Sequence, residues 1–214
     1  MRLVLPRLYV ILDLELLTLP AKACAQELAG AGVRLLQYRH KSASARELLA
    51  NAGELARALV PLGVSFLVND RPEVAFLAGA SGVHVGQEDL DVEQARALVG
   101  REKWVGISTH NLQQFQTAAA TSADYIAVGP IFATASKAHV DPVVGVEFIR
   151  RVRPLTAKPI VAIGGITLER AASVVEAGAD SVAVISEIMR AADPAERARQ
   201  YLAILNAADH AAAV

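Results

Sequence analysis

The stretch PIVAIGGITLERAASVVEAGADSVAVIS, residues 159–186, holds the pattern that decides the fold. Two short runs of β-branched residues, 159–163 and 181–185, flank a segment whose apolar residues recur with helical spacing. Thr167 stands where the helix should begin, as an N-cap, and Gly178 stands where it should end. The order strand, helix, strand is typical of the unit that joins neighbouring parallel strands.

The same alternation recurs along the whole chain. The expected strands are Leu8–Asp13, Leu35–His40, Ser65–Asn69, Gly82–Val85, Trp104–Ser108, Tyr125–Gly129, Pro159–Ile163 and Ser181–Ile185. The expected helices cover residues 19–31, 43–62, 71–79, 91–99, 111–121, 145–153, 167–177 and 194–206. Asp91, Asn111 and Asp193 stand at helix starts as further N-caps.

Eight strand–helix units leave two architectures, an open doubly wound sheet and a closed (β/α)8 barrel. An open dinucleotide-binding sheet calls for a glycine-rich turn after the first strand, but residues 11–17 read ILDLELL without a glycine. A barrel forms with as few as about 200 residues, and no linker or low-complexity segment divides this chain. The sequence therefore predicts an α/β fold, a single (β/α)8 TIM barrel over residues 1–214.

Composition and charge exclude several classes of function. The 21 Lys and Arg residues nearly balance the 22 Asp and Glu residues, which argues against binding to nucleic acid or anionic lipid. No apolar run reaches the roughly 18 residues of a membrane helix, and Asp13 and Glu15 interrupt the apolar N-terminus, so we expect no signal peptide. Cys24 is the sole cysteine, so no internal disulfide forms. We expect a cytoplasmic protein, as a monomer or homo-oligomer.

The chemistry of a barrel should lie where its strands end. The second expected strand runs into Gln37-Tyr38-Arg39-His40-Lys41, and alternation places Gln37, Arg39 and Lys41 on one side. Two cations and an amide at the mouth of a barrel suit a phosphorylated ligand. The alternative is a solvated basic loop.

Asp70 and Asp89 follow the third and fourth expected strands. A carboxylate pair that faces basic residues favours Mg²⁺ with a diphosphate, whereas the alternative for each residue is a helix cap. Ser108 and His110 follow the fifth strand, where Ser108 could donate a hydrogen bond to the ligand. His110 could either titrate near neutrality or cap the next helix.

Three further loops complete the expected mouth. Residues 129–137 contain Thr134, Ser136 and Lys137, and they indicate either a lid over an anion or a plain surface loop. The segments 163–166 and 185–186 follow the last two strands, where barrels commonly bind phosphate through backbone N–H groups. The sequence therefore predicts two anion sites, one basic and metal-assisted and one built from backbone.

With these residues, the chain resembles the thiamine phosphate synthase family. The motifs that carry the resemblance are Gln37-x-Arg39-x-Lys41, Asn69-Asp70-Arg71, Gly82–Asp89, Gly106-x-Ser108-x-His110, Gly129–Lys137 and Ile163–Ile166. The resemblance implies a (β/α)8 fold and a transferase that requires Mg²⁺. Its substrates would be 4-amino-2-methyl-5-(diphosphooxymethyl)pyrimidine and a thiazole phosphate, and its products thiamine phosphate and pyrophosphate.

The resemblance also implies a role for each matching residue. The pyrimidine diphosphate would be bound by Gln37, Arg39, Lys41, Asn69, Ser108 and Lys137, of which Arg39, Ser108 and Lys137 would be catalytic. Mg²⁺ would be bound by Asp70 and Asp89. The thiazole phosphate would be bound by Thr134, Ala135, Ser136, Gly165, Ile185 and Ser186. Departures from the family pattern remove none of these residues: Ile11-Leu12-Asp13 lacks the frequent Thr-Asp, Ala133 replaces a frequent proline and Ser136 a frequent threonine.

Two other functions fit parts of the pattern. A thiazole tautomerase on the same barrel would use a histidine such as His110 but would not need the diphosphate and metal residues. A non-catalytic sensor of a phosphorylated ligand would not explain the paired carboxylates. Asp70, Asp89, Arg39 and Lys137 together favour the synthase.

Overall fold

The strands of the computed structural model, which describes residues 3–134 and 141–212, close into a parallel barrel in chain order. They are β1 (Leu8–Asp13), β2 (Leu35–Arg39), β3 (Ser65–Asn69), β4 (Gly82–Val85), β5 (Trp104–Thr109), β6 (Tyr125–Val128), β7 (Ile160–Ile163) and β8 (Ser181–Val184). β8 pairs with β1 in the register Leu8↔Val182, which closes the ring. The predicted (β/α)8 barrel is confirmed.

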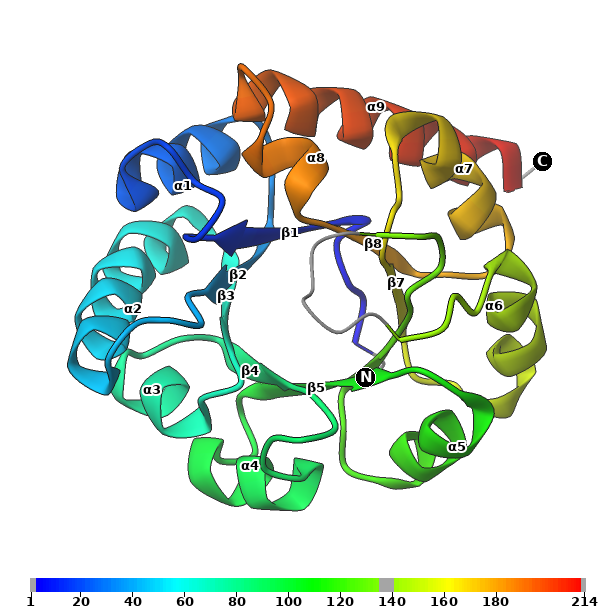
Figure 1. The fold of residues 1–214 in the computed structure, drawn as a ribbon, viewed down its shortest axis with the longest axis horizontal. Coiled ribbons are helices and arrows are strands. Elements are labelled where there is room, and N and C mark those ends of the chain that lie inside the picture. Colours follow the sequence, from blue (N-terminus) through cyan, green and yellow to red (C-terminus); the bar gives the residue numbers. More distant parts are fainter. Residues whose placement is uncertain (1–2, 135–140, 213–214) are drawn as a thin grey trace.

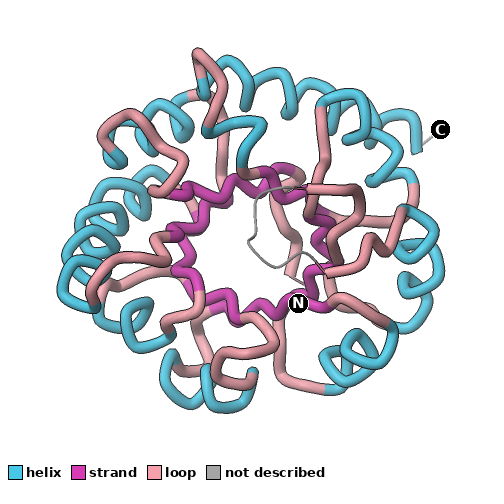
Figure 2. Tube along the Cα trace, viewed as in Figure 1, coloured by secondary structure: helices cyan, strands magenta, loops and turns pink. Residues whose placement is uncertain are grey.

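Helices surround the strand ring on the outside (Figures 1 and 2). They are α1 (Ala21–Gly30), α2 (Ala45–Leu59), η1 (Val60–Leu62), α3 (Pro72–Leu77), α4 (Val92–Val99), α5 (Leu112–Ala120), α6 (Val146–Val152), η2 (Arg153–Leu155), α7 (Leu168–Glu176), α8 (Ser186–Met189) and α9 (Pro194–Ala212). The sequence did not predict α8, because a helix of four residues is too short to show a periodicity. None of the helices in the described ranges is long and apolar enough to cross a membrane.

The predicted N-caps are largely confirmed. The side chains of Asp91, Asn111 and Asp193 each accept a hydrogen bond from a backbone N–H group in the first turn of α4, α5 and α9. Thr167 occupies the N-cap position of α7, but its side chain accepts no such bond. Its hydroxyl group hydrogen-bonds to the carboxylate of Glu169 instead, and this bond lowers the pKa of Glu169.

Alternation along the strands divides the apolar core into two layers. In β1, Leu8, Val10 and Leu12 pack outward against the helices. Tyr9 and Ile11 pack inside the barrel, within the cluster Leu5, Tyr9, Ile11, Leu35, Leu67, Tyr125, Ala127, Val161 and Ala183. Leu5 precedes β1 and belongs to this inner layer, so the N-terminal segment helps to fill the barrel at the end where the strands begin.

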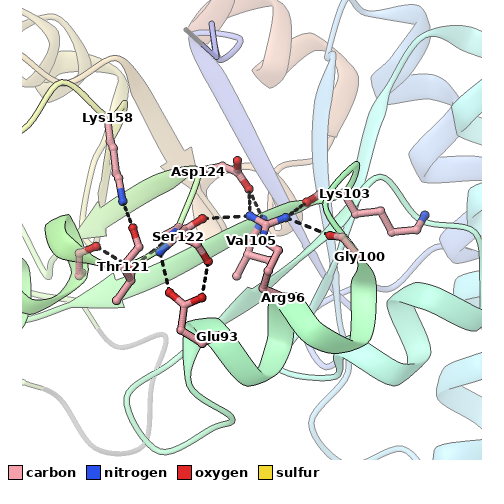
Figure 3. A network of polar contacts seen from close by, with 11 residues as sticks. Glu93, Arg96, Gly100, Lys103, Val105, Thr121, Ser122, Asp124 and Lys158 are labelled. Carbon is pink, nitrogen blue, oxygen red and sulfur yellow. Dashed lines mark hydrogen bonds and ion pairs between the residues drawn. The ribbon is translucent and has the colours of Figure 1, made fainter. Parts of the chain in front are cut away.

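Two matching clamps hold that same end. Asp124, directly before β6, accepts a hydrogen bond from a backbone N–H group of β5 and pairs with Arg96 of α4 (Figure 3). Asp180, directly before β8, accepts from the first N–H group of β7 and pairs with Arg153 of η2. Contacts at the amino ends of the strands stabilise a barrel, whereas its chemistry takes place at the carboxyl ends.

Candidate active site

A cavity of about 1100 Å³ opens at the carboxyl ends of the strands. Every predicted site residue in the described ranges lines it: Gln37, Arg39, Lys41, Asn69, Asp70, Asp89, Ser108, Thr134, Gly165, Ile185 and Ser186. The predicted residues Ala135, Ser136 and Lys137 lie outside the described residues. The strand ends therefore bring together side chains that are far apart in the sequence.

The carboxyl end of β2 supplies an amide and two cations. Gln37, Arg39 and Lys41 line the cavity, and Gln37 is only 2% exposed. Tyr38 points away from the cavity and packs in the outer apolar layer, where its hydroxyl group accepts a hydrogen bond from Asn51. The predicted alternation is confirmed. Gln37 and Arg39 are buried or partly buried rather than solvated, whereas Lys41 is exposed at the rim.

Arg39 already has an anionic partner. Its guanidinium group donates to the carboxylate of Asp13, a side chain that is 1% exposed at the end of β1. Glu15 places a second carboxylate oxygen 3.8 Å from the same nitrogen. Asp13 was not among the predicted site residues, although it alternates in phase with Tyr9 and Ile11 and pairs in register with Arg39. The Arg39 guanidinium group is therefore held in place and partly neutralised by these carboxylates.

The two predicted metal ligands lie together. Asp70 directly follows β3 with a φ of 62°, a left-handed conformation that aspartate tolerates better than most residues. Lys41 donates to the Asp70 carboxylate. Asp89 accepts a hydrogen bond of 2.7 Å from the N–H group of Gly86, and burial together with the neighbouring Asp70 raises the pKa of the Asp89 carboxyl group.

Neither aspartate caps a helix, so that alternative is wrong. The N-cap of α3 is Arg71, and that of α4 is Asp91. The two oxygen donors fit Mg²⁺, which binds one or two carboxylates and completes its shell with water and phosphate oxygens. Within residues 3–134 and 141–212 there is no group of three or more His, Cys, Asp or Glu that could hold a metal ion. A pair of carboxylates leaves coordination positions of Mg²⁺ open to substrate and water.

Buried polar side chains lie beneath this part of the cavity. His84 of β4 lies 2.8 Å from the hydroxyl oxygen of Ser108, and Gln37 of β2 lies 2.6 Å from the hydroxyl oxygen of Tyr9. Tyr125 of β6 contacts both His84 and Tyr9. Tyr9, His84 and Tyr125 were not among the predicted site residues, although each is a polar or aromatic residue within a largely aliphatic strand.

The loops after β6 and β7 form the opposite wall. Gly164 and Gly165 have φ values of 101° and 61°, and side chains on them would collide with Pro130 and Ala133, respectively. Arg170 of α7 also lines the cavity, and its guanidinium group lies 4.7 Å above the ring of Phe132. From the sequence we expected backbone donors at this wall, and the cation of Arg170 was not among the predicted residues.

His110 connects two loops. Its Nδ1 atom lies 2.6 Å from the carbonyl oxygen of Gly129, and its Nε2 atom lies 3.5 Å from a carboxylate oxygen of Asp141. Because Nδ1 faces a carbonyl oxygen, it carries a proton and donates. Asn111, and not His110, caps α5.

A (β/α)8 barrel with a carboxylate pair and cations on one wall and a glycine turn on the other defines a class of enzymes that act on phosphorylated ligands. The sequence pattern of the thiamine monophosphate synthase family matches residues 8–188. The thiamine-phosphate synthase of Koribacter versatilis (strain Ellin345) is 54% identical over 207 residues, covering 94% of this chain and 97% of the relative. That of Chloroflexus aurantiacus (strain ATCC 29366 / DSM 635 / J-10-fl) is 42% identical, covering 94% and 93%.

Solved structures agree with these relatives. The thiamine phosphate pyrophosphorylase from Pyrococcus furiosus superposes with a TM-score of 0.86 at 31% identity, covering 94% of this chain and 96% of that chain. The chain belongs to the thiamine monophosphate synthase family. The predicted family, the predicted class of enzyme, a transferase, and the predicted synthase function are thereby confirmed.

Proposed function

We propose that the chain condenses 4-amino-2-methyl-5-(diphosphooxymethyl)pyrimidine with a thiazole phosphate to give thiamine phosphate and pyrophosphate. One observation supports this above all: the Asp70–Asp89 pair and the cations Arg39 and Lys41 line the same cavity as the Gly165 turn. A diphosphate suits the first group, because cations and a metal offset its charge. A phosphate monoester suits the second, because glycine allows a ligand to approach the backbone.

The pyrimidine diphosphate would lie along β2, β3 and β5. Gln37, Asn69 and Ser108 would hydrogen-bond to it, while Arg39 and Lys41 would neutralise the diphosphate. Lys137, outside the described residues, is assigned to the same group by the family resemblance. Asp70 and Asp89 would hold Mg²⁺, which supplies positive charge to the leaving group when bound.

The thiazole phosphate would lie along β7 and β8. Thr134, Gly165, Ile185 and Ser186 line this part of the cavity and would bind its phosphate, together with Ala135 and Ser136 from outside the described residues. We add Arg170 as a cation at the edge of this site. The proposed partners are therefore two small molecules that bind in one mouth.

The reaction breaks the C–O bond between the pyrimidine methylene and the diphosphate. The diphosphate leaves with the bonding electrons as pyrophosphate, and the aminopyrimidine ring delocalises the positive charge on the methylene carbon. The thiazole nitrogen then forms the new C–N bond to that carbon. Arg39 and Lys41 stabilise the negative charge that develops on the leaving group, and the chemistry needs no protein nucleophile.

An assay of pyrophosphate release with each substrate omitted in turn tests this proposal. The synthase predicts release that requires both substrates and Mg²⁺. Conversion of the thiazole phosphate alone, without pyrophosphate, would instead indicate the tautomerase. Tight binding of either ligand without conversion would indicate the sensor.

A further inference from the structure

Four buried side chains and the partly buried Ser108 form a continuous hydrogen-bonded chain across the barrel. Gln37 Nε2 lies 2.6 Å from the Tyr9 hydroxyl oxygen, and the hydroxyl oxygens of Tyr9 and Tyr125 are 3.0 Å apart. The Tyr125 oxygen lies 2.9 Å from Nδ1 of His84, and Nε2 of His84 lies 2.8 Å from the Ser108 oxygen. The members come from β2, β1, β6, β4 and β5 in turn, so the chain connects β2 to β5 through the interior of the barrel.

The two ends of this chain are residues assigned to the pyrimidine diphosphate, and its three middle members have no assigned role. Tyr125 is fully buried, as are the ring of Tyr9 and most of His84. The rings of His84 and Tyr125 stack with centroids 5.6 Å apart, and Tyr9 meets Tyr125 edge to face. Close packing therefore fixes where each polar atom lies.

Gly106 makes the central link of the chain possible. A Cβ atom on Gly106 would overlap the ring of Tyr125. The glycine of the Gly106-x-Ser108 motif thus leaves room for the tyrosine to cross the barrel beneath Ser108. Strand β5 therefore supplies both the space for Tyr125, at Gly106, and the hydroxyl group at the end of the hydrogen-bonded chain, at Ser108.

One direction of the chain lets every hydroxyl group both accept and donate a hydrogen bond. In that direction Gln37 Nε2 donates to the Tyr9 oxygen, and Tyr9 donates its proton to Tyr125. Tyr125 then donates to Nδ1 of His84, which leaves the imidazole proton on Nε2, where it is donated to Ser108. Ser108 accepts at its oxygen and keeps its own proton for an acceptor in the mouth.

We propose that Tyr9, Tyr125 and His84 are positioning residues that fix the Ser108 hydroxyl group as a hydrogen-bond donor to the pyrimidine diphosphate. This inference rests on the proposed function, which places Ser108 and Gln37 against that substrate. Preorganised donors accelerate a reaction because they need no reorientation as charge develops.

The test is a double-mutant cycle on kcat/KM with both substrates and Mg²⁺. Ser108→Ala should lower kcat/KM by about 100-fold, the effect of removing one preorganised donor. Tyr125→Phe should lower it by about 5- to 10-fold, the loss of one hydrogen bond. The double variant should equal Ser108→Ala alone, because Tyr125 acts through Ser108.

Tyr38→Phe is the matched control, since it removes a hydroxyl group from another buried tyrosine that faces away from the cavity. It should leave kcat/KM unchanged. Should Tyr125→Phe fail to fold, Tyr9→Phe breaks the same chain one link away and should give the same cycle. ¹⁵N NMR of His84 in the unmutated protein adds a spectroscopic signature, a neutral imidazole protonated on Nε2.

Each contrary outcome has a separate meaning. Losses that multiply in the double variant, or a proton on Nδ1 of a neutral His84, would overturn the positioning role and leave the proposed function intact. Full activity in Ser108→Ala would overturn the assignment of Ser108 and the positioning role with it. Absence of pyrophosphate release from the unmutated protein would overturn the proposed function itself.

Discussion

No side chain fits on Gly165, because a Cβ atom there would collide with the carbonyl oxygen of Ala133. The turn after β7 therefore packs directly against the loop after β6, and the two loops form one wall of the cavity. The φ of Gly165 is 61°, and this adds a second reason for glycine, since other residues adopt the left-handed conformation at a cost in free energy. This wall is the proposed site of the thiazole phosphate.

Gly165→Ala should weaken binding of the thiazole phosphate by at least about 10-fold, because the strain of 1–2 kcal/mol typical of a left-handed alanine has to be relieved by moving this wall. Binding of the pyrimidine diphosphate should change little, since its proposed ligands lie on β2, β3 and β5. Calorimetric titration of each ligand into the variant measures both effects. An equal loss for the two ligands would show that the mouth responds as a unit and that the two sites are not separable.

Asp89→Asn should raise the Mg²⁺ concentration needed for half-maximal activity by at least about 10-fold. Replacing even a residue that only supports a metal ligand can lower metal affinity by about that factor. The amide keeps the shape of the side chain, so the fold should remain intact. A titration of activity with Mg²⁺ measures the change. Asp91→Asn is the control, because Asp91 caps α4 and asparagine caps equally well. An unchanged Mg²⁺ requirement in Asp89→Asn would remove this residue from the metal site.

Asp13→Asn should lower the free energy of unfolding by about 3 kcal/mol, because it leaves Arg39 with a buried charge that has lost its closest partner. Added pyrophosphate should stabilise this variant more than the parent protein, since the anion supplies a new partner for Arg39. Urea unfolding with and without pyrophosphate measures both effects.

Glu54→Gln provides the comparison for Asp13→Asn, because it breaks the exposed Lys22–Glu54 pair on the helical ring. The loss there should be at most about 1 kcal/mol. If pyrophosphate stabilises Asp13→Asn and the parent equally, Arg39 does not bind the diphosphate.

All four tyrosines of the chain, Tyr9, Tyr38, Tyr125 and Tyr201, have pKa values raised by burial. In the unfolded chain they lose protons near pH 10, whereas in the folded protein they retain them. Folding stability should therefore fall as the pH rises above about 10, because the unfolded state binds fewer protons there. Ultraviolet titration should show tyrosinate appearing together with the loss of helical circular dichroism. Tyrosinate in a protein that is still fully folded near pH 10 would contradict the burial of these groups.

The strands, and a set of side chains that line the cavity, could be predicted from the sequence for a physical reason. Alternation within a strand decides which side each residue faces, and parallel strands place their carboxyl ends together, so Gln37, Asp70 and Ser108 could be placed from local patterns alone. The register between strands is not local. Asp13 meets Arg39 only because β1 and β2 pair at that residue.

The buried hydrogen-bonded chain was beyond local patterns for the same reason. Tyr9, Tyr125 and His84 lie on β1, β6 and β4, which do not neighbour one another, and they meet only across the interior of a closed barrel. Arg170 likewise reaches the mouth from α7 by stacking on Phe132, a contact between a helix and the loop after β6. A polar residue within an inward-facing aliphatic pattern is the signal that sequence reasoning could have used.

The most direct test of the proposed reaction is a phosphorus NMR time course with the purified protein, the pyrimidine diphosphate, the thiazole phosphate and Mg²⁺ in one tube. The account predicts that both substrates decline together while thiamine phosphate and pyrophosphate rise in a one-to-one ratio. Pyrophosphate that forms at the same rate without the thiazole phosphate, or spectra that do not change, would contradict it.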